Sequence, residues 1–103
     1  MAYDAGSFDA TLAAAAGDDP ELRAQLRAGF VESLDHHVDL LRRARCDGNW
    51  EVAAQRLKGL GASFHSPDLV RLADEALDGA PGEPAVVRKL DRLCADFTAS
   101  QQA

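Results

Sequence analysis

The sequence has few aromatic residues and no long apolar run. Aromatic residues make up only 6% of its 103 residues, although 47% are hydrophobic. Ala, Leu and Val fill most apolar positions, a composition that favours closely packed helices over a β-sandwich. A chain of this length has room for one domain with one core. We therefore expect an all-α protein.

Cysteine is also scarce. Cys46 and Cys94 lie far apart and form no CxxC pair, whereas disulfide frameworks and zinc sites need more, closely spaced ligands. We expect two plain buried or half-buried thiols, with no metal and no cofactor. The N-terminus lacks the basic and apolar regions of an export signal, and the longest apolar run, residues 12–16, is far too short to span a bilayer. These features favour a soluble, cytoplasmic protein.

Basic residues are outnumbered, with 11 Lys and Arg against 17 Asp and Glu, for a formal net charge of -6. The field of such a chain repels nucleic acids and anionic membranes. Neither is expected as a partner.

Helix start and stop signals divide the chain. A Pro that follows an N-cap residue marks the start of a helix, and a Gly after an apolar stripe marks its end. The expected helices cover residues 8–16, 20–45, 49 to about 65, 67–78 and 84–98. The last four carry apolar stripes, which predicts an antiparallel up-down four-helix bundle with a short N-terminal capping helix. The domain is expected to span residues 8–98, with flexible ends at 1–7 and 99–103.

The third helix has an unusual outer face. At about 100° per residue, its core stripe comprises Trp50, Ala53, Ala54, Leu57, Leu60, Gly61 and Phe64. The opposite face holds Gln55, Gly59, Ala62 and Ser66, flanked by Arg56, Ser63, Lys58 and His65. A solvated face usually carries charged helix formers, and Gly59 costs the helix about 1 kcal/mol relative to Ala. Either a neighbouring element crosses closely at Gly59, or the face docks another protein. We favour docking because the face points away from the predicted bundle.

The residues around this face resemble a known family. The run AQRLKG at 54–59, followed by Ala62-Ser63-Phe64, Leu69 and Ala73, is similar to the A-H-x-L-K-G signature of histidine-containing phosphotransfer (HPt) domains. The resemblance extends to residues 18–22, Phe30 and Asn49-Trp50, and covers about residues 8–97. It implies a four-helix bundle in a bacterial two-component phosphorelay, whose partners are a receiver domain of a response regulator or a sensor histidine kinase. It also implies that Lys58 offsets phosphate charge and that Gly59 gives the receiver clearance.

The sequence departs from the family at the phosphorylated residue. Gln55 occupies the place of the acceptor histidine, and His65 stands where many members have glycine. A carboxamide is a poor nucleophile but forms hydrogen bonds. The prediction is a non-phosphorylatable (pseudo-HPt) module, not an enzyme, that docks its partner as a monomer. The expected docking residues are Gln55, Arg56, Lys58, Gly59, Ala62, Ser63 and Ser66.

Two alternatives stay open. The protein could be an active phosphotransfer protein, either because His65, about 15 Å along the helix from Gln55, accepts the phosphoryl group or because Gln55 replaces a natural histidine. It could instead be a structural bundle that forms a homodimer through the third helix.

The other two histidines are weaker candidates for functional residues. His36 lies near Glu32 and Asp39 at helical spacing, which is typical of a solvated face, and His37 lies closer to the core stripe. Trp50, Phe64 and Phe97 are expected in the core.

Overall fold

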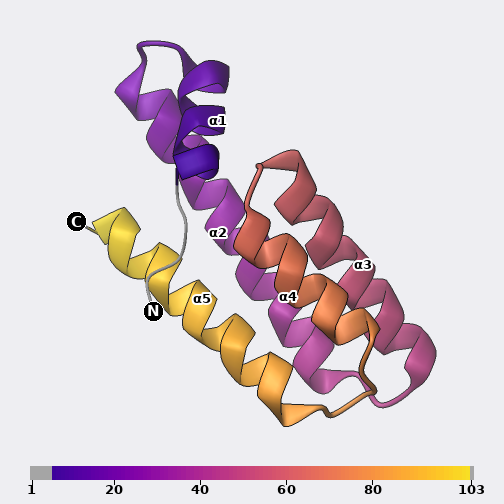
Figure 1. The fold of residues 1–103 in the computed structure, drawn as a ribbon. Helices are drawn as coiled ribbons and strands as arrows, with labels where there is room; N and C mark the ends of the chain where they lie inside the picture. The colour runs from indigo at the N-terminus through magenta and orange to yellow at the C-terminus, as the bar shows by residue number, and fades with distance from the viewer. Residues whose placement is uncertain (1–5, 103) are drawn as a thin grey trace.

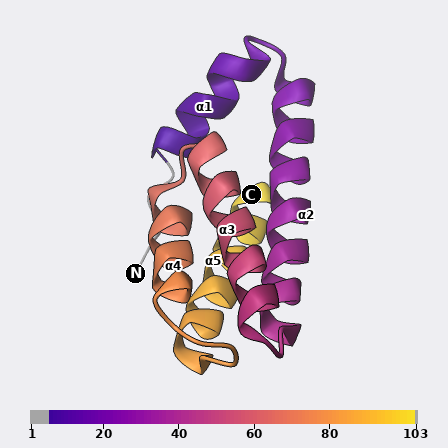
Figure 2. The ribbon, with the colours of Figure 1, turned by 90° about the vertical axis from the view of Figure 1, so that its right-hand side faces the viewer.

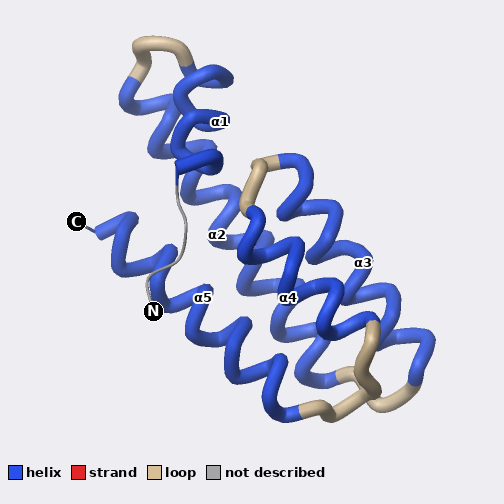
Figure 3. Tube along the Cα trace, viewed as in Figure 1, coloured by secondary structure: helices blue, strands red, loops and turns tan. Residues whose placement is uncertain are grey.

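The computed structural model describes residues 6–102. Within that range the chain forms helices and no strand (Figures 1 and 3). The helices are α1 (Gly6–Ala16), α2 (Pro20–Arg43), α3 (Asp47–Ser63), α4 (Pro67–Leu77) and α5 (Pro84–Gln102). The prediction of an all-α protein is confirmed.

Helices α2 and α4 begin where the capping signals place them. The Asp19 carboxylate accepts the backbone N–H groups of Glu21 and Leu22 at 3.0 and 3.1 Å, which opens α2. Ser66 caps α4 in the same way, because its hydroxyl oxygen accepts the N–H of Leu69 at 3.4 Å. A proline follows each cap, where its missing N–H costs nothing.

Several helix boundaries differ from those expected. α1 begins at Gly6, two residues early, and α3 begins at Asp47 rather than near Asn49. α2 ends at Arg43 rather than at Arg45, because Ala44 leaves the helical conformation. α5 continues to Gln102, so residues 99–102, which were expected to be a flexible end, are helical. The expectations for residues 1–5 and 103 lie outside the described residues.

Contacts join α2 to α3, α3 to α4, α4 to α5 and α5 back to α2, so these helices form a closed cycle around one core. α2 extends past the ends of α3 and α4, and α1 lies against this extension (Figures 1 and 2). Leu22, expected in the core stripe, is 38% exposed near the start of α2. That correction follows from the arrangement, since only α1 covers this end of α2.

An aromatic cluster joins α1 to the core. The Phe8 ring lies 4.6 Å from the Phe30 ring and 5.0 Å from the Phe97 ring, and the Phe30 ring lies 5.0 Å from that of Phe64. The Arg27 guanidinium covers the Phe8 ring at 5.2 Å and pairs with Asp9 at 3.4 Å. Phe97 thus belongs to the core, as predicted, whereas Phe64 is only partly buried and packs against it.

α3 and α4 pack closely because Gly61 has no side chain. A Cβ at Gly61 would lie 3.0 Å from both the backbone nitrogen and Cγ2 of Val70 and 3.1 Å from Cβ of Leu69. The buried Trp50 joins the same two helices, since its indole Nε1 donates to the carbonyl of Ala76 at 2.7 Å.

The two α3 glycines should respond oppositely to alanine. Gly61→Ala should lower the free energy of unfolding by about 1–3 kcal/mol, because the new methyl meets α4 backbone that cannot move aside. Gly59→Ala, with no atom within 4 Å of its Cβ position, should raise it by up to about 1 kcal/mol. Urea denaturation of both variants measures this, and equal effects would contradict the packing.

The thiols have different environments. Cys46 is exposed, which corrects the expectation that it would be buried or half-buried, whereas Cys94 is half-buried as expected. Burial, together with the charge of Asp35 and a hydrogen bond to it, raises the pKa of Cys94 to about 12.

Only Cys46 should therefore react with iodoacetamide in the native protein at mildly alkaline pH. The nucleophile is the thiolate, and Cys94 stays protonated until the pH approaches its raised pKa. Peptide mass mapping after a timed reaction measures both sites. Labelling of Cys94 as fast as Cys46 would show that its burial is wrong, and urea-unfolded protein, in which both should react, is the control.

Candidate functional site

The outer face of α3 is open. Gln55, Arg56, Gly59, Ala62 and Ser63 are all exposed. Apart from the neighbouring backbone of α3 itself, no atom of the described residues lies within 4 Å of a Cβ placed on Gly59. The packing of this chain therefore explains Gly61 but gives no reason for Gly59.

Ser66 does not belong to this face. It is 0% exposed, and its hydroxyl group caps α4. Its assignment as a docking residue is corrected, because α3 ends at Ser63 and the helical projection does not continue to Ser66.

Lys58 marks the edge of the face nearest α4. Its Nζ lies 2.8 Å from the carboxylate of Asp74 on α4, and the two side chains are 44% and 48% exposed. Such a surface pair contributes at most about 1 kcal/mol. The main effect of this ion pair is to hold the Lys58 ammonium group beside the open outer face of α3. The other N–H donors of the ammonium group stay free for a second acceptor.

The structure adds residues that the sequence prediction omitted. Gln55 and Arg56 line a shallow depression of about 440 Å³ together with Gly48, Glu51 and Val52. Val52 is 52% exposed, an unusual environment for a large apolar side chain in a helix. Its position three residues before Gln55 would have placed it on the outer face.

His65 lies beyond the end of α3, not in its last turn as expected. Its φ of 55° is the only positive value at a non-glycine residue among those described. The N–H of Ser66 donates to the Gly61 carbonyl at 2.8 Å and that of His65 to the Ala62 carbonyl at 3.3 Å. This is the Schellman motif, whose left-handed position is usually glycine.

A contact between His65 and Thr11 joins the turn after α3 to α1. The Thr11 hydroxyl donates to the Ser7 carbonyl at 2.9 Å, and its oxygen lies 2.9 Å from Nδ1 of His65. In the tautomer that carries its proton on Nδ1, the ring donates to this oxygen and Nε2 keeps a lone pair.

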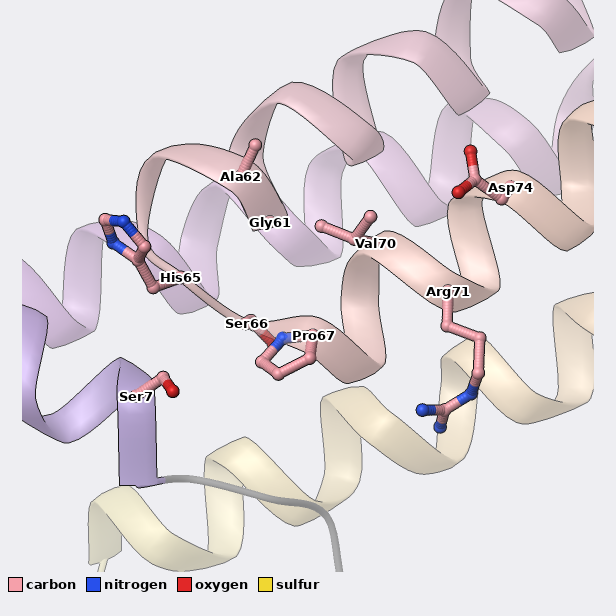
Figure 4. Close-up of a pocket in the computed structure, with 9 residues that line it drawn as sticks. All are labelled: Ser7, Gly61, Ala62, His65, Ser66, Pro67, Val70, Arg71 and Asp74. Atoms are coloured by element: carbon pink, nitrogen blue, oxygen red, sulfur yellow. The ribbon is translucent and has the colours of Figure 1, made fainter.

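His65 lines a groove of about 540 Å³ between α3, α4 and the start of α1. Figure 4 shows His65 at one end and Asp74 at the other, with Val70 and Pro67 between them. Ala62 borders both this groove and the open face, whereas Gln55 lines only the separate depression towards the start of α3 and a neighbouring one.

The histidines of α2 lie elsewhere. His36 is exposed, and its ring lies 5.1 Å from that of the half-buried His37, whose Nδ1 lies 2.8 Å from the Ser33 carbonyl. Asp39 is paired with Arg42 at 3.2 Å and with Arg43 at 2.9 Å. Across residues 6–102 no group of three or more His, Cys, Asp or Glu side chains is placed to hold a metal ion.

Searches of protein-family models, curated proteins and solved structures gave no match to this chain. Among the described residues, no helix has the length and apolar character needed to cross a membrane.

The backbone at His65 predicts an order of stability for two variants. His65→Ala and His65→Gly both remove the imidazole, but only glycine adopts a positive φ without strain. The alanine variant should be less stable than the glycine variant by about 1 kcal/mol. Thermal denaturation of the pair measures the difference, and a more stable alanine variant would contradict the left-handed turn.

Proposed function

We propose that this protein is a cytoplasmic HPt-like module of a bacterial two-component phosphorelay that docks a receiver domain or a sensor kinase without accepting a phosphoryl group at position 55. The observation that carries the proposal is the open face around Gly59, a residue that costs helix stability and whose presence no contact among residues 6–102 accounts for.

The arrangement of the helices supports the proposal. We propose that α2 to α5 form the antiparallel up-down four-helix bundle of this family, since their contacts close a cycle and short connections join them. In that bundle α3 presents Gln55 outward.

The chemistry of the face suits docking better than phosphoryl transfer. The Gln55 amide can donate and accept hydrogen bonds but is not a nucleophile of the kind an imidazole provides. Arg56 and Lys58 place positive charge beside it, which complements an acidic receiver surface, and Gly59 allows a partner's backbone to approach.

Docking is tested with a matched pair of lysine variants. Gly59 and Gly29 are both exposed helical glycines with no atom within 4 Å of a Cβ position, and Gly29 lies on α2. Gly59→Lys should weaken binding to receiver domains at least tenfold, because the lysine side chain would occupy the space over the outer face of α3 that the partner needs. Gly29→Lys should leave binding unchanged.

The measurement is a calorimetric titration against a panel of purified receiver domains and sensor-kinase catalytic regions. If Gly59→Lys bound as tightly as the parent, or if no receiver or kinase bound the parent, docking at this face would be excluded.

One observation favours the second candidate, an active phosphotransfer protein. In the tautomer in which Nδ1 of His65 donates to the Thr11 hydroxyl, Nε2 keeps a lone pair and is available as a nucleophile. Incubation with phosphoramidate, followed by intact mass and phosphorus NMR, separates the two candidates. The leading proposal expects labelling only in the Gln55→His control, whereas an acid-labile phosphoryl group on His65 of the parent would support transfer.

A further inference from the structure

The exposed residues of α3 form a regular line. Gly48, Val52, Gln55, Gly59 and Ala62 are spaced by four, three, four and three residues, and all are exposed. This spacing keeps side chains on one side of a helix and is the spacing of a seam between two helices. We call these five residues the α3 strip.

We infer that the α3 strip binds the α3 strip of a second copy of this chain. The two helices run antiparallel about a two-fold axis beside Gln55. In this register Val52 of one copy faces Gly59 of the other, Gln55 faces its own counterpart, and Gly48 faces Ala62.

The side chains in each layer fit one another. Val52, which is 52% exposed, projects as a knob, and the open space over Gly59 provides the hole that receives it. At the axis the two Gln55 amides are self-complementary, since each has both a donor and an acceptor. A two-fold contact requires such self-complementarity.

One flank of the strip adds charge complementarity. Glu51 and Lys58 are seven residues apart and so lie on the same side of α3, and Lys58 pairs with Asp74 of α4 on that side. Antiparallel pairing brings Glu51 of each copy to within roughly 3 Å, measured along the helix axis, of Lys58 of the other. The Lys58 ammonium group has three donors, so it can hold both Asp74 and the new carboxylate.

The other flank and the net charge oppose the contact. Arg56 faces Arg56 of the second copy, and each chain carries a formal charge of -6. The area is small too, since α3 has 17 residues and one pair of such helices buries less than the roughly 1,200 Å² of a stable interface. The pair therefore forms reversibly at high concentration, and the protein is a monomer when dilute.

Pairing would cover Gln55 and Gly59, so it would compete with any partner that docks there. The inference does not rest on the proposed function, because it uses only the exposure, spacing and charge of α3.

Disulfide trapping tests the register. In a Cys46→Ser background, Gln55→Cys places a thiol at the two-fold axis. Ser63→Cys places one on the same exposed face but roughly 24 Å along the helix axis from its counterpart. A disulfide needs Cα atoms within about 7 Å.

Oxidised glutathione supplies the oxidant, and non-reducing gels measure the rate of dimer formation. We expect the Gln55→Cys protein to crosslink at least tenfold faster. Equal rates, or a faster Ser63→Cys protein, would overturn the register.

Sedimentation equilibrium of the unmodified chain gives a second measurement. Its weight-average mass should rise from micromolar to millimolar concentration, whereas Val52→Lys, with circular dichroism to confirm the fold, should stay monomeric. A parent that remains monomeric at millimolar concentration refutes the inference. Receiver binding is measured at micromolar concentration, where the chain is a monomer, so a failure of self-association and a failure of docking are distinguishable.

Discussion

The close contact between α3 and α4 at Gly61 is the constraint on which the rest of the molecule depends. With no Cβ at Gly61, the α4 backbone approaches α3 within van der Waals distance, and the indole of Trp50 bonds the Ala76 carbonyl on the same interface. Once these two contacts fix the rotation of α3 about its axis, the residues on the opposite side must face outward. The exposure of Gln55 and Gly59 is therefore a consequence of how α3 packs.

The same contact determines the turn that follows α3. Because α4 must begin directly beside Gly61, the chain reverses within the few residues after Ser63, and the N–H of Ser66 returns to the Gly61 carbonyl. The reversal forces His65 into a left-handed conformation. It also brings the ring within hydrogen-bond distance of Thr11 on α1. One short turn thus joins three helices, and the aromatic cluster around Phe8 buries the apolar side of the same junction.

The sequence predicted what depends on local chemistry and apolar spacing. The caps at Asp19 and Ser66 are local hydrogen bonds, and the core side of α3 follows from its periodicity, so both could be found without coordinates. Long-range features could not. The burial of Ser66 depends on where α3 ends, and the ion pair of Lys58 depends on which α4 residue lies opposite it. The exposure of Leu22 depends on how far α2 extends beyond α3 and α4. Val52 was missed for a different reason: its apolar side chain gave no polar signal.

The environment of Trp50 determines what optical spectroscopy can report about this protein. It is the only tryptophan in the chain, it is 3% exposed, and its N–H is bound to α4. The fluorescence of Trp50 therefore reports whether the α3–α4 interface is intact. Its emission maximum will shift to longer wavelength when that interface opens to water. Trp50 also lines a depression that Gln55 borders, together with Glu51 and Leu77, so a ligand bound at that end of the outer face would change its surroundings too. One native fluorophore thus reports both on unfolding and on binding beside Gln55.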